Sequence, residues 1–367
     1  MRIAQVAPLF ESAPPQLYGG TERVVSYLTE ELVDLGHRVT LFASGDSVTR
    51  ADLVPGCSRA LRLGGSADAA DRAHAAMLAQ VYERRHEFDV IHLHIGDWHL
   101  REPRLLKSSH VTTVHDPIDS PENLAIYDSP ALRLVSISDA QRRPLPAASW
   151  LGTVYHGLPD GLYRPRYERG SYLTFLGRIS PETRVDRAID IARRFGMPLK
   201  IAAKVDRADY QYYLSIRHML REPFVEFVGE VNETQKSELL AGAYALLFPI
   251  DWPEPFGLAM IEAMASGTPV IAWRNGSVPE LVDQSVTGFV INSIEGAVSA
   301  LSRVAQLDRR LVARVAYQRF AARRMARDYL RLYARSIARD LDVQALLGMS
   351  LRDVSAHADV IDAPAAE

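Results

Sequence analysis

The sequence of 367 residues contains a single cysteine, Cys57. One thiol excludes a disulfide within the chain and any metal cluster built on cysteine. Cys57 stands in a Pro-Gly-Cys-Ser stretch without a base beside it, so we expect an inert loop thiol and not a nucleophile. Such sparse use of cysteine is typical of the cytoplasm, where we expect the protein to reside.

Long apolar runs are also absent. Residues 243–250 form one of the longest, and Pro249 interrupts it well before the length that a bilayer-spanning helix needs. The apolar start of the chain is short, resembles a strand, and lacks a small-residue cleavage site after it. We therefore expect neither a transmembrane segment nor a signal peptide.

The sequence has no excess of either charge. Lys plus Arg number 42 and Asp plus Glu number 45, which gives a formal net charge of −3. This balance does not indicate nucleic acid or an anionic membrane as the main partner. The length exceeds what one hydrophobic core usually serves, so two domains are expected.

Short β-rich runs alternate with helical patterns along the chain, which favours an α/β fold with open parallel sheets. Several of the runs are almost entirely apolar, as expected for strands that are covered on both faces. The first series of predicted strands is Arg2–Ala7, Arg38–Ala43, Asp89–His94, Val111–His115 and Leu132–Ile137. The second series is Tyr172–Leu176, Leu199–Ala203, Val225–Val228, Ala245–Pro249 and Pro269–Trp273.

The two series predict two Rossmann-like domains, residues 1–163 and 164–318. Glycine, proline and charge accumulate over Gly157–Gly170, where we expect the boundary. Ligands of open α/β sheets bind outside the carboxyl ends of the strands. Two such sheets facing each other would enclose a cleft able to hold two substrates.

The C-terminal part differs in composition. Residues 319–340 predict a helix that packs back towards the first domain through Met325, Tyr329 and Tyr333. Arginine recurs every fourth residue from Arg319 to Arg339. We favour a solvated face of the helix as the interpretation of this row. The alternative is that the row contacts an anionic acceptor or a lipid headgroup. We expect the acidic residues 341–367 to be largely disordered.

The most informative stretch runs from Pro249 to Ala272 and predicts a strand, a loop with two prolines, a helix and a new strand. Glu254 lies in the loop, and Glu262 follows one helical turn after Leu258. The backbone N–H groups at the start of this helix, from Phe256, Gly257 and Leu258, would face a bound anion. A carboxylate suits the paired hydroxyls of a ribose or a hexose, because it accepts two hydrogen bonds.

These residues resemble the family-4 retaining glycosyltransferases with the two-domain GT-B fold. The resemblance rests on Glu254-Pro-Phe-Gly, on Glu262-Ala-Met-Ala-Ser-Gly-Thr-Pro-Val, and on the downstream Gly276-Ser-Val-Pro-Glu280 and Val286-Thr-Gly-Phe289, and it extends from Met1 to about Arg339. It implies that Glu262 binds the donor ribose and that Glu254 binds the transferred sugar. A capped helix in an unrelated α/β domain is the structural alternative.

The resemblance also implies that a positively charged side chain contacts the donor diphosphate. Gly177-Arg178 resembles the family's Gly-Arg at a strand end, and a fixed guanidinium there would stabilise the leaving diphosphate. The family usually has a lysine five residues later, where this sequence has Thr183. Arg184 would supply the missing charge if it faces the cleft. Lys204, at the end of the next strand, is a weaker candidate for a donor contact or a solvated lysine.

In the first domain, Gly19 and Gly20 resemble the family's glycine-rich loop after the first strand, which approaches the diphosphate or the acceptor. The loop lacks the Gly-x-Gly-x-x-Gly fingerprint of dehydrogenases. An ordinary loop with Thr21 as the helix N-cap is the alternative. His115 resembles the family's histidine near the reacting sugar, or else is a structural histidine.

No metal site is expected. His92, His94, Asp97 and His99 lie near one another in sequence, but Arg and helix N–H groups can neutralise the donor phosphates, and no Asp-x-Asp motif is present. The resemblance also implies no cofactor, and no motif for a pyridoxal-binding lysine supports a phosphorylase.

The function that the resemblance implies is transfer of a hexose-type sugar from a nucleotide sugar, with UDP-sugar favoured, to an unidentified hydroxyl acceptor. The family retains the anomeric configuration, and without a nameable nucleophile we expect front-side attack beside the leaving diphosphate. Catalysis would then rest on Arg178, Glu254 and His115. The main alternative, suggested by Thr183, is a nucleotide-sugar-binding protein with weak or no transfer; a GT-B epimerase is a further one.

Overall fold

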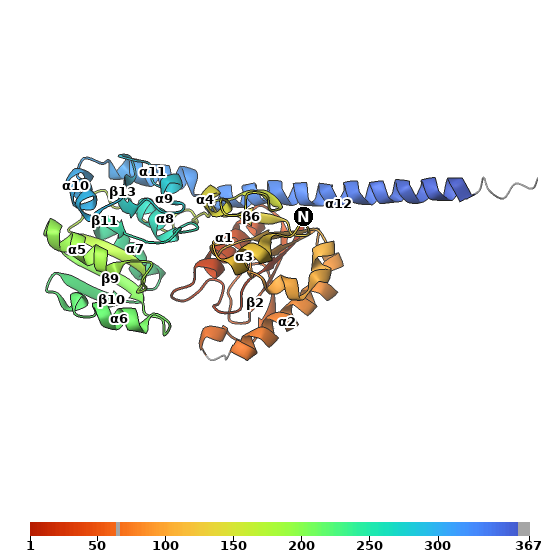
Figure 1. Ribbon diagram of the computed structural model, residues 1–367, viewed down its shortest axis with the longest axis horizontal. Coiled ribbons are helices and arrows are strands. Elements are labelled where there is room, and N and C mark those ends of the chain that lie inside the picture. The colour runs from red at the N-terminus through yellow and green to blue at the C-terminus, as the bar shows by residue number, and fades with distance from the viewer. Residues whose placement is uncertain (64–66, 359–367) are drawn as a thin grey trace, which may run out of the picture.

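The computed structural model describes residues 1–63 and 67–358 and contains two parallel β-sheets (Figure 1). The first sheet has the strand order β3-β2-β1-β4-β5-β6-β7. Its strands are β1 (Arg2–Val6), β2 (Arg38–Ser44), β3 (Asp52–Cys57), β4 (Val90–Leu93), β5 (His110–Thr113), β6 (Leu134–Ser136) and β7 (Trp150–Thr153). The second has the order β10-β9-β8-β11-β12-β13. Its strands are β8 (Tyr172–Arg178), β9 (Leu199–Lys204), β10 (Val225–Gly229), β11 (Ala243–Phe248), β12 (Val270–Trp273) and β13 (Gly288–Ile291).

Helices cover both sheets and join successive strands. The α-helices are α1 (Gly20–Asp34), α2 (Ala67–Glu83), α3 (Pro121–Tyr127), α4 (Asp139–Arg142), α5 (Val185–Phe195), α6 (Tyr210–Ile216), α7 (Glu233–Gly242), α8 (Leu258–Ala265), α9 (Val278–Leu281), α10 (Ile294–Val304), α11 (Arg309–Arg319) and α12 (Ala322–Ala358). Short 3₁₀ segments lie at Leu61–Leu63, Arg85–Glu87, Trp98–Arg101, Pro103–Lys107 and Met219–Arg221. None of the helices in the described ranges is both long and apolar enough to cross a membrane.

The core follows from the alternation of side chains along each strand. In β1, Ile3 points to the face that α1 and α12 cover, whereas Ala4 and Val6 point to the opposite face. There they pack with α2 residues such as Met77. Because both faces are covered, the central strands are apolar throughout, as parallel sheets require.

The predicted α/β class with two parallel sheets is confirmed, and the ten predicted strands are present with ends shifted by up to two residues. Three further strands were not predicted: β3, β7 and β13. All three lie at sheet edges, where pairing on one side only removes the need for an unbroken apolar run. The strands of the two sheets lie on either side of residues 154–171, and a boundary at residue 163 stays a prediction.

The helix α12 differs from the expectation at its end. We expected disorder from residue 341, but the helix continues to Ala358, and Figure 1 shows it projecting past the first domain. Residues 359–367 lie outside the described part of the chain. Met325, Tyr329 and Tyr333 are fully buried, whereas Arg323 and Arg327 of the arginine row are exposed. Arg319 is an exception, because it ends α11 and pairs with Asp283 (2.8 Å), so the predicted helix over residues 319–340 begins only at Ala322.

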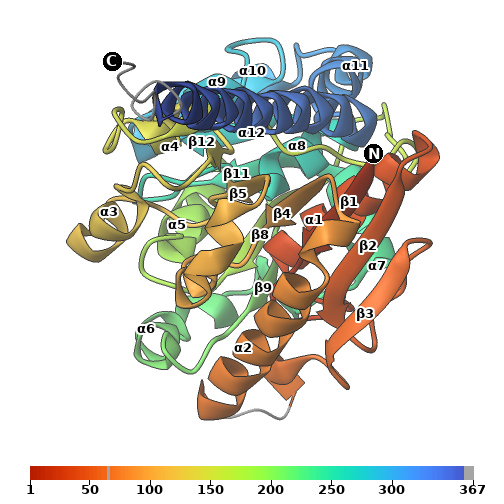
Figure 2. The same ribbon diagram turned by 90° about the vertical axis from the view of Figure 1, so that its right-hand side faces the viewer.

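The chain passes between the domains twice, at one place that we call the crossing (residues 157–158 and 320–322). The outgoing Leu158 accepts a hydrogen bond from the Ala322 N–H (2.8 Å) and donates its own N–H to the Phe320 carbonyl (2.7 Å). After the crossing, α12 runs back onto the first domain (Figure 2). Gly157 allows the two segments to touch, because a Cβ there would lie 2.6 Å from the Ala321 carbonyl oxygen.

This close approach predicts a cost for any side chain at position 157. Gly157→Ala should lower the free energy of unfolding by about 1–3 kcal/mol, because backbone atoms would have to move apart. Gly152→Ala is the matched control, since its Cβ would meet only Leu332 side-chain atoms at 3.4 Å or more. Urea denaturation measures both variants. Equal losses of stability in the two would contradict the role assigned to the crossing.

Candidate active site

A cavity of about 580 Å³ lies between the two domains and is lined by residues of both. We call it the central cavity. Ten of the predicted site residues line it, and they come from both sheets: Gly19, Gly20, His115, Arg178, Lys204, Glu254, Phe256, Gly257, Leu258 and Glu262. The last residues of β8 and β9 and the loops and helix starts after β1, β5 and β11 carry them, so the carboxyl ends of both sheets face this space.

The segment Asn275–Ser277 is hydrogen-bonded to the loop that carries Glu254. The Glu254 carbonyl accepts a hydrogen bond from the Ser277 N–H (3.0 Å), and the Ser277 hydroxyl donates to the Phe256 carbonyl (2.6 Å). Gly276 has a positive φ of 53° and lies against the Glu254 backbone, with no space for a Cβ. The Gly-Ser pair of the sequence motif therefore positions the Glu254 loop.

The Glu254 side chain lines the central cavity just before α8. Burial raises its pKa to about 7, and the nearby Arg178 charge and N–H groups of the helix start oppose this rise only partly. Its Oε1 accepts a hydrogen bond of 3.4 Å from the Phe256 N–H. Gly257, with φ of 86°, turns the chain into α8 directly after this carboxyl. Glu254 is thus ready to gain stabilising donors from a ligand.

Glu262 belongs to a group of charged side chains that spans both domains. Its carboxylate is buried and accepts a hydrogen bond from the Lys236 ammonium at 2.5 Å. Lys236 also contacts Glu233 (3.1 Å), which binds Arg23 from the first domain. We call these four residues the charged network. Lys236 and Arg23 both line the central cavity, and the sequence carried no motif that could have identified them.

A second contact between the domains centres on Glu280, the last residue of the Gly-Ser-Val-Pro-Glu motif. Its carboxylate accepts hydrogen bonds from the N–H groups of Asp139 (2.8 Å) and Ala140 (2.6 Å) at the start of α4. The Tyr155 hydroxyl donates to the same carboxylate (3.0 Å). A side chain of the second domain therefore caps a helix of the first.

Arg178 and Lys204 form a positive edge of the cavity. They are the last residues of neighbouring parallel strands and are paired in register. Arg178 contacts Glu182 (3.1 Å) and Lys204 contacts Asp206 (2.6 Å), so each has one acidic neighbour. Side by side at the strand ends, the two cations suit an anion with two charges.

The opposite side of the cavity is formed by the loop Leu17–Gly20 and the start of α1. Gly19 packs against Pro15, where a Cβ would approach to 2.8 Å. The helix begins at Gly20, with Gly19 and not Thr21 in the N-cap position. The Arg23 guanidinium donates to the Leu17 carbonyl (2.7 Å) and fixes the loop beside α8.

His115 lies in the cavity beside His156, which the sequence did not single out; their rings stack at 5.4 Å. Burial lowers the pKa of His115 to about 3, so the ring is neutral near pH 7. His92 and His94 are buried behind it and hydrogen-bonded to protein groups. Within the described residues, no three His, Cys, Asp or Glu side chains are arranged to hold a metal ion. Independence of metal stays a prediction.

Comparison with known families decides the classification. Residues 18–151 match the family described as Glycosyltransferase Family 4, and residues 164–312 match Glycosyl transferases group 1. The chain belongs to glycosyltransferase family 4. Members of this family use a nucleotide sugar as donor, and the resemblance seen in the sequence is confirmed.

Individual relatives agree in length and fold. An uncharacterized glycosyltransferase of Methanocaldococcus jannaschii is 24% identical over 343 residues, which cover 79% of this chain and 84% of the relative. The sucrose-phosphate synthase of Thermosynechococcus elongatus has a TM-score of 0.74 at 18% identity, over 92% of this chain and 99% of that one. Anabaena HepE, solved with UDP and glucose, has a TM-score of 0.72 at 19% identity, over 91% and 99%. These structures share the GT-B fold.

The family-4 pattern has a lysine where this chain has Thr183, and we expected Arg184 to supply that charge if it faces the cleft. Thr183 lines the cavity, but Arg184 is not among the described lining residues. Its guanidinium binds Asp186 (2.7 Å) and Asp251 (3.0 Å). Thr183 instead closes the turn after β8, because its hydroxyl donates to the Arg178 carbonyl (2.8 Å). Two acidic neighbours hold the Arg184 guanidinium, and a role of Arg184 in place of the lysine stays untested.

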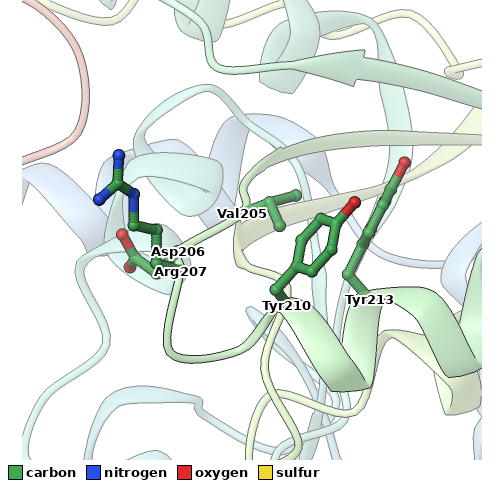
Figure 3. Close-up of a pocket in the computed structure, with 5 residues that line it drawn as sticks. All are labelled: Val205, Asp206, Arg207, Tyr210 and Tyr213. Carbon is green, nitrogen blue, oxygen red and sulfur yellow. The ribbon is translucent and has the colours of Figure 1, made fainter.

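A shallower depression of about 510 Å³ adjoins the central cavity and shares Asp206 with it. It is lined by Val205, Asp206, Arg207, Tyr210 and Tyr213 (Figure 3). The Tyr210 and Tyr213 rings stack at 5.8 Å, and Tyr210 is half exposed. The depression extends the site of this family-4 protein past Lys204 towards α6.

The raised pKa of Glu254 predicts a pH-dependent stability. In the unfolded chain this carboxyl ionises near its ordinary pKa of 4.5, whereas in the fold it ionises near 7. Its contribution therefore becomes unfavourable as pH rises from about 4.5 to 7. Glu254→Gln should raise the melting temperature relative to wild type at pH 8 more than at pH 5. The exposed Glu238→Gln serves as control, and an equal difference at both pH values for Glu254→Gln would contradict the assignment.

Proposed function

We propose that this family-4 protein transfers a hexose-type sugar from a nucleotide sugar to a hydroxyl acceptor, with retention of configuration. The observation that carries the proposal is the gathering of two carboxylates and two cations around one cavity. Glu254 and Glu262 come from the loop and helix after β11, and Arg178 and Lys204 from the ends of β8 and β9. Carboxylates suit sugar hydroxyls, and the cations suit a diphosphate.

Glu262 is assigned to the ribose of the donor. One carboxylate oxygen, Oε1, accepts a hydrogen bond from Lys236, so this buried carboxylate has a cationic partner. Its remaining acceptor positions can take two ribose O–H groups. Lys236 is thereby a positioning residue for Glu262, and the charged network connects the donor site to Arg23 of the first domain.

Arg178 and the start of α8 are assigned to the diphosphate. In a front-side reaction the bond between the sugar C1 and the phosphate oxygen breaks, and the acceptor oxygen bonds to C1 on the same face. The acceptor proton passes to the leaving phosphate oxygen. Negative charge grows on the diphosphate during this step, and a fixed guanidinium with free helix N–H groups stabilises it.

Glu254 and His115 are assigned to the transferred sugar. Ionised Glu254 accepts hydrogen bonds from sugar hydroxyls beside α8, and His115 reaches the same space from β5. Closing the two domains over both substrates excludes water and limits hydrolysis of the donor.

We favour a UDP-sugar as donor, no metal or other cofactor, no nucleic-acid partner and a cytoplasmic location. Support for UDP comes from frequency in the family and from the HepE structure with UDP and glucose. A relative from Mycolicibacterium smegmatis is described as GDP-mannose-dependent, so the donor assay must include several bases.

A second candidate function is nucleotide-sugar binding with weak or no transfer. It is favoured by one observation: Thr183 stands at the cavity where the family usually has lysine, and Arg184 is held by acidic side chains elsewhere. Both functions require donor binding, and only the first releases free nucleoside diphosphate in the presence of an acceptor.

A donor screen tests the proposal. UDP-, GDP- and ADP-sugars are added to the purified protein, and thermal unfolding is followed. A ligand at 100 times its Kd should stabilise the fold by about 2.7 kcal/mol. Glu262→Ala should abolish the shift, and Glu238→Ala, an exposed glutamate outside the cavity, should retain it. Folded protein that responds to none of the donors would contradict donor binding.

The cations give a separate prediction. Lys204→Met should weaken donor binding roughly tenfold or more, because a charge-assisted contact is worth about 1.5–3 kcal/mol. Arg184→Met should weaken it less than about fivefold, since the ion pairs that are lost are partly exposed and lie outside the cavity lining. Isothermal titration calorimetry with the donor from the screen measures both. A greater loss for Arg184→Met than for Lys204→Met would reverse the assignment of the two residues.

A further inference from the structure

A continuous series of hydrogen bonds leads from His115 in the central cavity to helix α12. His115 Nε2 lies 2.9 Å from His94 Nδ1, and His94 Nε2 lies 2.8 Å from Gln5 Oε1. The Gln5 amide donates to the Tyr333 hydroxyl at 3.0 Å. We call these four residues the histidine chain. Gln5 and His94 lie on or directly after the central strands β1 and β4, and Tyr333 lies on α12.

The chain continues beyond Tyr333 into the core. The Tyr333 hydroxyl lies 2.7 Å from His92 Nδ1, and His92 Nε2 lies 2.7 Å from the Thr113 hydroxyl. Thr113 in turn contacts the hydroxyl of Tyr329 at 2.9 Å. Every one of these groups except His115 is almost completely shielded from solvent.

Gln5 sets the direction of the hydrogen bonds. Its carbonyl oxygen can only accept, so His94 Nε2 must carry a proton. Burial lowers the pKa of His94 well below its ordinary value, so His94 is neutral and its Nδ1 accepts. His115 Nε2 is then the donor. Because His115 is neutral as well, its Nδ1 has a lone pair and no proton.

The same direction holds on the other side of Gln5. The Tyr333 hydroxyl accepts from the amide and gives its own proton to His92 Nδ1. His92 is neutral through burial, so its proton lies on Nε2 and is donated to Thr113. All donors therefore point away from the cavity. Within the described residues, His115 Nδ1 has no protein partner, and it remains available to a ligand in the cavity that His115 lines.

We propose that Tyr333 of α12, through Gln5 and His94, holds His115 in the Nε2-protonated tautomer, so that its Nδ1 accepts a hydrogen bond from a sugar hydroxyl. The contact with a sugar hydroxyl rests on the proposed function. The tautomer itself does not. Tyr333 and Gln5 are positioning residues in this arrangement. Since α12 begins at the crossing, the tautomer of His115 depends on how the C-terminal helix docks onto the first sheet.

Histidine ¹⁵N chemical shifts test the tautomer without any substrate. In protein labelled with ¹⁵N-histidine, wild-type His115 should be protonated at Nε2 alone near pH 7. Tyr333→Phe should introduce the Nδ1-protonated form of His115, because the Gln5 amide loses its acceptor and can turn over. Gln5→Met should do the same, because His94 loses the oxygen that accepts from its Nε2. Gln5→Glu should keep the wild-type tautomer, since a carboxylate oxygen still accepts from His94. Tyr244→Phe removes another buried hydroxyl, bonded to the Leu301 carbonyl, and is the matched control.

Kinetics test the use of the tautomer. In Tyr333→Phe, kcat for sugar transfer should fall roughly five- to tenfold, the value of one hydrogen bond, while KM for the donor changes little. Nδ1-protonated His115 in wild type, or an unchanged tautomer in both Tyr333→Phe and Gln5→Met, would overturn the proposal. So would a changed tautomer with unchanged kcat. If wild type transfers no sugar at all, the proposed function fails, and the ¹⁵N shifts alone decide the positioning claim.

Discussion

The crossing determines how the two domains of this protein meet. Two hydrogen bonds of Leu158 and the absence of a side chain at Gly157 hold the outgoing and returning segments together. From there α12 runs along the first sheet, where its Tyr329 and Tyr333 enter the same core as Val111 and Val135. The position of the central cavity follows, because its two sides belong to domains that are joined at this place. A displaced crossing would move Glu262 relative to His115 without changing either domain internally.

Charge arrangement within the cavity explains how buried acids and bases coexist. Glu262 and Lys236 neutralise each other, so neither is an isolated buried charge, whose desolvation would cost several kcal/mol. Among the described residues Glu254 has no cation at ion-pair distance, and burial raises its pKa. A ligand that brings hydroxyl donors to Glu254 and a diphosphate to Arg178 would satisfy both at once. Glu254 and Arg178 thus match the two kinds of group, hydroxyls and a diphosphate, that a nucleotide sugar carries.

Much of this arrangement could be predicted from the sequence, and the exceptions have physical causes. Apolar runs mark the central strands, whereas the edge strands β3 and β7 are interrupted by Gly56 and Gly152 and pair on one side only. Glu254 and Glu262 followed from a contiguous motif. Lys236 and Gln5 did not, since their roles depend on partners 26 and 328 residues away, respectively. For Arg184 the sequence position was known but the partners were not. A residue next to a motif can direct its long side chain to acidic groups elsewhere, and Arg184 pairs with Asp186 and Asp251.

Contacts between the domains differ in kind around the cavity. The crossing is made by two backbone hydrogen bonds, which do not depend on salt, whereas the cap on α4 is made by the Glu280 carboxylate. Elsewhere the domains meet through ion pairs, among them Arg62 with Glu230 at 3.0 Å, both partly exposed. Exposed ion pairs weaken as ionic strength rises, and the Debye length is only about 8 Å in physiological salt. Rising ionic strength is therefore expected to weaken these ion pairs while leaving the backbone hydrogen bonds of the crossing unchanged.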